Sequence, residues 1–443
     1  MIVDRNFVIE KITQHTAEFV EVKNPGYVYP TAEYYPLAPK IHQLDALNTA
    51  LMDMDGTTTT TEVLCIFSLE QMVRRMSGLY KMDQWEGIDH HADLPYIIGN
   101  STTRHVEYLI SKYGNLINSE IVSRSFIEAA AWTLRHGRDA QRQAEVIQNL
   151  RKAGQHEVIN QMIQKDLSAD EISSLAGKIK ANDFTSWVSL GIDIYYEIYH
   201  RILGLLGEGK SKEVRRLVFG NENSGGELIS PMPGIIVLLP LLKGWLGREA
   251  SVMAPLLFDD YLKSTGNRIT DEKKETLSQR LVSLGIHFEK NPVKLGLVTS
   301  SIFYEANIVI NEVLGVVAHA IAESQLSPER KARIIEACSD YHLWYDAFVT
   351  ASDSSEIRLK PHRDLYSIAL HKAGVMPSEF MKVIGFEDSQ SGTVAIRAAG
   401  IGCCIAVPFA QTHGHDFSAA THIALGGIPE VLLDHQLFIK NVS

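Results

Sequence analysis

The sequence predicts an α/β protein: a doubly wound parallel sheet with a large inserted helical domain. Two observations support this prediction. After about residue 290, short apolar segments alternate with stretches of helical periodicity, a pattern typical of a parallel sheet covered by helices on both faces. Residues 63–227, in contrast, repeat apolar residues near every 3.6 positions, which indicates helices alone.

The strands are predicted from short apolar runs that end at turns. The first run, residues 49–52, leads directly into the letters DMDG. The later runs are VKLGLVTSS, YDAFVTASD, MKVIGFEDS and IGCCIAVP. Helical pieces such as DLYSIALHKAG and TVAIRAAG lie between them and close with the glycine expected after a helix. We therefore expect the first strand to join the later ones in one sheet, although the helical block separates them in the chain.

The length of 443 residues suggests two or three domains. The N-terminal stretch NPGYVYPTAEYYPLAP indicates an extended, irregular arm packed on the body. The polar stretch TGNRITDEKKETLSQR lies in a further insertion whose place the sequence does not fix. The expected divisions are an N-terminal extension at 1–45, a catalytic core at 46–62, 228–247 and 291–443, a helical cap domain at 63–227, and an additional insertion at 248–290.

Composition narrows the possible partners. A hydrophobic share of 45% and a charged share of 21% are typical of a soluble globular protein. The 42 basic and 53 acidic residues give a net charge of −11, which disfavours nucleic acid as a partner. Without an uninterrupted apolar run of about 18 residues, no membrane partner is expected, and the cytoplasm is the expected location. The cysteines have no metal-site spacing and favour buried free thiols; they are Cys65, Cys338, Cys403 and Cys404.

Polar side chains follow the predicted strands at the points where the strands end. These residues are Asp53 and Asp55 after the first strand, Thr299 and Ser300 after the second, Lys360 in the loop after the third, and Glu387 and Asp388 at the fourth. Ligands of such sheets bind beyond the carboxyl ends of the strands, so we expect these side chains to converge. Crowded carboxylates repel one another unless a cation lies among them, and oxygen ligands favour Mg²⁺. A carboxylate beside a metal ion and a lysine can attack phosphorus, which predicts magnesium-dependent phosphoryl transfer.

The motifs DMDGT, VTSS, KP and GFEDS resemble motifs I to IV of the haloacid dehalogenase superfamily, in their usual order. The passage from KPHRDLYSIALHKAG to IGCCIAVP is similar to the β-phosphoglucomutase-like branch. The resemblance covers roughly residues 47–63 and 291–427, with the PMPG segment, and the cap is larger than that of the branch. It implies a Rossmann-like core with an inserted helical cap.

The resemblance also implies roles for single residues. Asp53 would be the nucleophile that becomes a phosphoaspartate, and Asp55 the general acid and base. Thr299, Ser300 and Lys360 would bind the phosphoryl group. Mg²⁺ would be held by Asp53, the Asp55 carbonyl and Asp388, helped by Glu387. The run Thr58 to Thr61 departs from the residues usual in the family, which bears on cap motion and substrate choice.

Several functions are compatible with this pattern. Hydrolysis of a small phosphorylated metabolite is favoured. The alternatives are a phosphomutase acting on a sugar phosphate and a catalytically silent binding or regulatory protein of the same fold. Dehalogenases and phosphonate hydrolases of the superfamily lack the second aspartate, so Asp55 argues against both.

Simpler interpretations exist for individual residues. A calcium loop around DMDG is excluded because Leu51 would have to be its first ligand. Thr299 and Ser300 could cap the following helix, which is compatible with phosphate binding. For the remaining candidates we favour the structural interpretation over a metal, anion or substrate site: His90 and His91 in a solvated loop, GKSKEVRR at 209–216 as a solvated helix face, and Tyr195, Tyr196 and Tyr199 as cap core.

Overall fold

The computed structural model divides the chain into two compact units. The first combines Met1–Thr60 with Ile229–Ser443, and the second is Thr61–Leu228. Each unit is described by itself. The structure describes residues 2–14, 18–24, 28–97, 102–179, 181, 183–221, 228–355, 358–409, 412 and 414–442.

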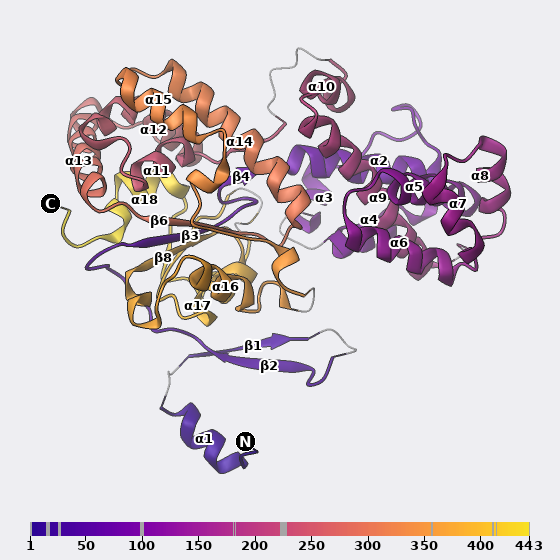
Figure 1. The fold of residues 1–443 in the computed structure, drawn as a ribbon, viewed down its shortest axis with the longest axis horizontal. Coiled ribbons are helices and arrows are strands. Elements are labelled where there is room, and N and C mark those ends of the chain that lie inside the picture. Colours follow the sequence, from indigo (N-terminus) through magenta and orange to yellow (C-terminus); the bar gives the residue numbers. More distant parts are fainter. Residues whose placement is uncertain are drawn as a thin grey trace. The chain divides into compact units, whose positions relative to one another are not determined.

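A six-stranded parallel sheet forms the centre of the first unit, in the order β10-β9-β8-β3-β6-β7 (Figure 1). The strands are β3 (Thr49–Asp53), β6 (Lys294–Val298), β7 (Ala347–Val349), β8 (Val383–Glu387), β9 (Cys403–Ala406) and β10 (His422–Ile423). All residues of β3 and β8 are buried, as near-continuous apolar strands of a covered parallel sheet should be. In register, Asp53 lies beside Val298. The predicted α/β fold is confirmed, and the first strand does join the later ones.

Helices cover both faces of this sheet. Figure 1 shows α11 and α14 on one side, and α16 and α17 on the other. The helices of this unit that follow the second unit in the chain are α11 (Ile235–Leu242), α12 (Ala254–Thr265), α13 (Asp271–Lys290), α14 (Phe303–Glu323), α15 (Pro328–Ala337), α16 (Asp364–Lys372), α17 (Gln390–Ala398) and α18 (Gly427–Leu433). Residues 248–290, whose place the sequence left open, form most of a short 3-10 helix (Gly247–Met253) and then α12 and α13, both of which pack on α18. By length and hydropathy α14 could cross a membrane, but 50% of its apolar 18-residue window is buried, as in a core helix.

The N-terminal segment is more regular than predicted. After α1 (Arg5–Ile12), strands β1 (Phe19–Lys23) and β2 (Ala32–Pro36) form an antiparallel hairpin, so the expectation of an irregular arm is wrong for these residues. Alternation explains the hairpin, since β1 turns Val20 and Val22 inward and Glu21 outward. Val22 packs in one cluster with side chains of α17.

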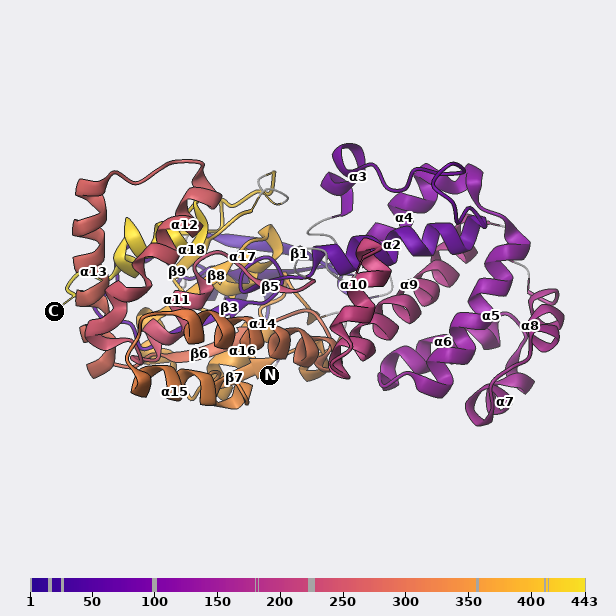
Figure 2. The ribbon, with the colours of Figure 1, turned by 90° about the horizontal axis from the view of Figure 1, so that it is seen from above.

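The second unit is built from helices in all its described regular segments (Figure 2). They are α2 (Glu62–Ser77), α3 (His90–Ile97), α4 (Thr102–Tyr113), α5 (Ser119–His136), α6 (Ala140–Lys152), α7 (Ile159–Gln164), α8 (Ala169–Ala176), α9 (Phe184–Gly207) and α10 (Ser211–Phe219). The longest, α9, packs against α2, α4 and α5. Polar caps begin several helices: Asn118 accepts hydrogen bonds from two backbone N–H groups of α5, and Asp183 does so from one of α9.

Three groups of residues singled out in the sequence lie in the second unit. Tyr195 and Tyr199 are buried in its core, as predicted, and Tyr196 is half-buried. Lys212 and Arg216 of the basic run are exposed on α10, consistent with a solvated helix face. The loop expected at His90 and His91 is wrong, because α3 begins there; their side chains lie outside the described part of the structure.

The four cysteines were predicted to be buried thiols outside disulfides and metal sites. None of the four cysteines, all of which the structure describes, forms a disulfide; Cys403 and Cys404 are buried, and Cys65 and Cys338 are partly buried.

Candidate active site

The first site residue, Asp53, ends the central strand and is buried. The chain then turns tightly, with the N–H groups of Thr58 and Thr59 donating to the Met54 carbonyl at 2.9 and 2.8 Å. Gly56 has a φ of +86°, and a Cβ at this position would lie 2.7 Å from the carboxyl carbon of Asp388. Glycine is therefore required for the turn to pass alongside Asp388.

The threonines after Gly56 hold this turn in place. Thr57 Oγ1 donates to Asp388 Oδ1 at 3.4 Å, and Thr58 Oγ1 donates to the Asp53 carbonyl at 2.6 Å. Thr59 lies in the short strand β4 (Thr59–Thr60), which pairs with β5 (Ser230–Pro231). All three side chains are buried. The threonine side chains thus hold the turn that carries Asp55 through contacts with Asp53 on one side and Asp388 on the other.

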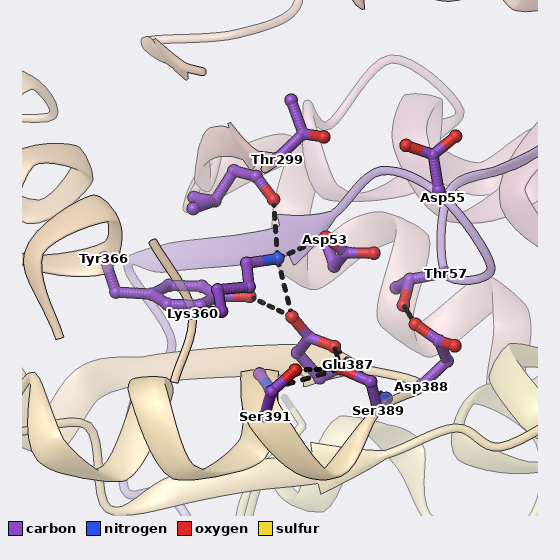
Figure 3. Close-up of polar contacts among 12 residues, drawn as sticks. Asp53, Asp55, Thr57, Thr299, Lys360, Tyr366, Glu387, Asp388, Ser389 and Ser391 are labelled. Carbon is purple, nitrogen blue, oxygen red and sulfur yellow. Dashed lines mark hydrogen bonds and ion pairs between the residues drawn. The ribbon is translucent and has the colours of Figure 1, made fainter. Parts of the chain in front are cut away.

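Lys360 connects the ends of three neighbouring strands. Its Nζ donates to Asp53 Oδ1, to Glu387 Oε1 at 2.7 Å and to the Val298 carbonyl at 3.0 Å (Figure 3). An ammonium group has three donors, so all of them are used. Burial alone would lower the pKa of Lys360, but the charges of Asp53 and Glu387 outweigh burial and raise it. The lysine is therefore charged.

Glu387 is fixed from both sides. Its Oε1 accepts from the Tyr366 hydroxyl at 3.1 Å, and its Oε2 accepts from the Ser389 hydroxyl at 2.9 Å. Ser389 also caps α17, because its Oγ accepts from the Gly392 N–H at 3.1 Å. A Cβ at Gly392 would lie 1.8 Å from the Glu387 carboxyl carbon. The helix start is therefore shaped around this carboxylate, which in turn holds Lys360.

The site contains more negative than positive charge. Asp53, Glu387 and Asp388 are buried and each offers an oxygen within 4.8 Å of the others, while one ammonium group contacts two of them. Burial, followed by the charge of Glu387, raises the pKa of Asp53 and of Asp388 well above the usual range, although Lys360 opposes this. A further cation would relieve the repulsion, and an all-carboxylate donor set suits Mg²⁺. Both oxygens of Glu387 accept side-chain hydrogen bonds, whereas Asp53 and Asp388 each accept one through Oδ1 alone, so Asp53 and Asp388 are the better ligands.

The remaining predicted residues lie beside this group. The Asp55 carboxylate accepts from Ser301 Oγ at 3.3 Å and points away from the other carboxylates in Figure 3. Thr299 is buried, and its Oγ1 accepts from the Ser301 N–H at 3.0 Å. Ser300 is exposed.

The structure thus brings Asp53, Lys360, Glu387 and Asp388 into one cluster. The Asp55 carboxylate lies outside this group, and the ligand predicted at this residue is its backbone carbonyl.

Three residues of the site were not predicted from the sequence: Tyr366, Ser389 and Ser301. Ser389 could have been found, because a serine three residues before Gly392 at the start of a helix is a typical cap. Tyr366 has no such signal, since it appears as an apolar position of α16. Ser301 could have been grouped with Thr299 as part of the same polar strand end.

Comparison with known proteins gives one curated relative. No family model matches the chain. A phosphorylated carbohydrates phosphatase of Thermotoga maritima is 24% identical over 245 residues, which are 54% of this chain and 89% of that protein.

Solved structures also match at low identity. CbbY from Rhodobacter sphaeroides in complex with phosphate is 15% identical, with 88% of this chain and 96% of that chain covered and a TM-score of 0.38. A β-phosphoglucomutase from Clostridium difficile is 13% identical, with 88% and 96% covered and a TM-score of 0.35. Scores of this size do not establish a shared arrangement of the whole chain. The chain is thus similar to a phosphatase over about half of its length, and its four motifs resemble those of the haloacid dehalogenase superfamily.

Proposed function

We propose that this chain is a magnesium-dependent phosphatase that hydrolyses a small phosphate monoester through a phosphoaspartate on Asp53. The observation that carries the proposal is the set of contacts of Lys360, which holds Asp53 and Glu387 together beside a third buried carboxylate. Such a site has a nucleophile, a fixed positive charge and a deficit of cations, which together suit a phosphoryl group. The curated relative is named as a phosphatase of phosphorylated carbohydrates, and we propose the same substrate class here.

The reaction divides into two steps. In the first, an Asp53 carboxylate oxygen forms a bond to phosphorus while the bond from phosphorus to the ester oxygen breaks. Asp55 donates a proton to the departing oxygen. In the second, Asp55 takes a proton from water, the water oxygen bonds to phosphorus, and Asp53 leaves as a carboxylate. Lys360 neutralises charge near the phosphoryl oxygens throughout.

The placement of Asp55 suits this role. Its carboxylate is held by Ser301 rather than by Lys360, so it lies apart from the charge that fixes Asp53. Asp53, Asp388 and the Asp55 carbonyl would hold Mg²⁺, with Glu387 as their support. The ion would supply further neutralisation of the phosphoryl oxygens.

We also propose that the helical unit Thr61–Leu228 governs substrate choice without supplying the nucleophile. The position of the catalytic residues supports this proposal, because every residue assigned to chemistry above belongs to the first unit. Because the exposed basic run of α10 is a solvated helix face, substitutions in it should leave the relative rates among substrates unchanged, and a changed substrate profile would instead assign it to substrate recognition. In either case, these substitutions should leave phosphoaspartate formation from a small aryl phosphate intact.

A substrate panel tests the proposed function. Purified protein with Mg²⁺ is incubated with hexose phosphates and other phosphomonoesters, and both released phosphate and isomerised sugar are recorded. Released phosphate without isomer is the expected result. Isomer without net phosphate would identify a phosphomutase, and neither product from any ester would favour the silent binding protein.

A further inference from the structure

The loop that carries Lys360 lies between β7 and α16. Within this loop, the N–H of His362 donates to the Leu359 carbonyl at 3.0 Å, which makes a single turn around the lysine. The lysine must nevertheless aim its ammonium group at three separate oxygens. A loop needs contacts from outside to hold such an aim.

Those contacts come from the N-terminal hairpin. Arg358, two residues before the lysine, donates from Nη1 to both oxygens of Glu33 at 2.9 and 2.8 Å. The same guanidinium donates to the Asp364 carboxylate through Nε at 2.8 Å and Nη2 at 2.9 Å. Arg358 therefore joins strand β2 to the first residue of α16, and these contacts bracket Lys360.

A second contact lies on the other side of the lysine. Tyr35 OH is 2.8 Å from Nδ1 of His362, and it also contacts Glu33 Oε2. An ionised Glu33 can only accept, so the tyrosine proton goes to Glu33 and the His362 Nδ1–H donates to the tyrosine oxygen. Hydrogen bonds from Tyr35 and Arg358 lower the pKa of Glu33 to about 2, which keeps it ionised. The three groups form one chain of hydrogen bonds directed from the lysine loop to the hairpin, in which His362 donates to Tyr35 and Tyr35 donates to Glu33.

The hairpin segment is also anchored near the end of β8, where Glu387 lies. Val22, Tyr35 and Leu37 share a buried cluster with Val394 and Ala398 of α17, the helix that starts around the Glu387 carboxylate. The guanidinium of Arg397, also on α17, is fully buried and donates to the Ala38 carbonyl at 2.7 Å. The segment thus spans the two loops that position Lys360 and Glu387.

We propose that Glu33 and Tyr35 are positioning residues for Lys360, and that the N-terminal hairpin braces the lysine loop against α17. The catalytic meaning of this proposal rests on the function proposed above. A hairpin that only covered apolar surface would need the contacts of Val22 and Leu37. It would not need the polar contacts with Arg358, two residues before the lysine, and with His362, two residues after it.

Matched variants on the same hairpin test the brace. The test variants are Tyr35→Phe and Glu33→Gln. Their controls are Tyr34→Phe and Glu21→Gln, because the exposed Tyr34 donates to Glu21 at 2.7 Å and neither touches the lysine loop. Tyr35→Phe and Tyr34→Phe make the same chemical change, as do Glu33→Gln and Glu21→Gln. Only the first variant of each pair alters a contact with the lysine loop.

The first readout does not depend on activity. The rate at which a water-soluble acetylating reagent modifies Lys360 is measured by mass spectrometry, with Lys294 and Lys372 as internal references. The test variants should speed the modification of Lys360 by about fivefold, the equivalent of one net hydrogen bond. The controls should leave it unchanged. Equal rates in test and control variants would overturn the brace, whatever the enzyme does.

The second readout is turnover of an aryl phosphate. The test variants should lower kcat by about fivefold with KM little changed, and the double variant should lose no more than about the worse single one, since both act through one chain. If the wild type hydrolyses esters but Lys360 labelling is insensitive to the variants, the brace fails and the proposed function stands. If labelling responds but no ester is hydrolysed, the brace stands and the function fails. Should Glu33→Gln not fold, Tyr35→Phe carries the test alone.

Discussion

Buried carboxylates occur in both units, but they are balanced differently. In the second unit, Asp93 accepts from Tyr108, Tyr113 and Lys112, and Glu197 is paired with both Arg75 and Arg201. In the first unit, the ammonium group of Lys360 pairs with Asp53 and Glu387, and Asp388 is a third carboxylate of the same group. Carboxylates with their own partners hold a structure together, whereas a group that is short of positive charge is prepared for a ligand.

The direction of the pKa shifts follows this contrast. Burial alone would raise the pKa of Asp93, but the hydrogen bonds from Lys112 and the tyrosines outweigh burial and lower it. In the first unit, burial and mutual repulsion raise the pKa of Asp53 and Asp388. The same residue type is therefore stabilised as an anion in one unit and destabilised as an anion in the other.

The largest expected effect comes from removing one charge of the unbalanced group. Asp388→Asn should reduce Mg²⁺-dependent turnover by about 10²-fold or more, because stabilisation by a metal ion is worth several kcal/mol. Without Mg²⁺ its thermal stability should equal or exceed that of the wild type, since repulsion is relieved. Turnover with and without chelator, and melting curves with and without Mg²⁺, measure both. Full wild-type activity after exhaustive chelation would contradict the metal assignment.

The balanced group should respond in the opposite way. Asp93→Asn should destabilise the protein by about 2 kcal/mol, because the buried side chain loses charge-assisted hydrogen bonds. Chemical denaturation of this variant and of Asp388→Asn, both without Mg²⁺, makes the comparison directly. If the two variants changed the free energy of unfolding by the same amount and sign, the contrast between the units would be broken.

A smaller effect is expected for Asp193, which is intermediate between the two groups. It accepts from Asn149 Nδ2 at 2.7 Å, and Nη1 of Arg142 lies 3.5 Å away. Burial raises its pKa from 3.8 to about 6, against the charge of Arg142. Because the folded state then binds the proton more tightly than the unfolded state, the contribution of Asp193 to stability falls as pH rises from 3.8 to about 6.

The variant Asp193→Asn lacks this titration. Relative to the wild type it should become more stable as pH rises through the same window, by an amount on the order of 1 kcal/mol. Denaturation curves at several pH values give the difference in unfolding free energy. A difference independent of pH would show that Asp193 does not titrate there.

The contrast between the units also explains how much could be predicted. The strands of the sheet were predictable because each is a short apolar run, and Asp53, Glu387 and Asp388 were found because they stand where such runs end. Nothing similar marks Asp93, Asp193 or Glu197, which resemble ordinary polar positions on amphipathic helices. Their burial depends on how the helices pack, and the spacing of apolar residues does not fix that packing.

Other features of the site depend on contacts between distant segments. Tyr366 looks like a core position of α16 until the structure places its hydroxyl on Glu387. The hairpin was missed because the letters NPGYVYPT indicate a break, and the pairing of the strands on either side requires burial against α17. Tyr35 and His362 are separated by more than three hundred residues in the chain, so the sequence gives no sign of their contact.

One measurement tests the central claim, that Asp53 is the nucleophile of a phosphoryl-transfer site. The variant Asp55→Asn keeps Asp53 and its contact with Lys360 but lacks the proton donor and base. It is mixed with an aryl phosphate whose leaving group needs no proton, and released phenol and protein-bound phosphate are followed. We predict a burst of phenol, then near arrest, with phosphate located on Asp53 by mass spectrometry and no burst from Asp53→Asn. A burst from Asp53→Asn, or phosphate on another residue, would contradict the account.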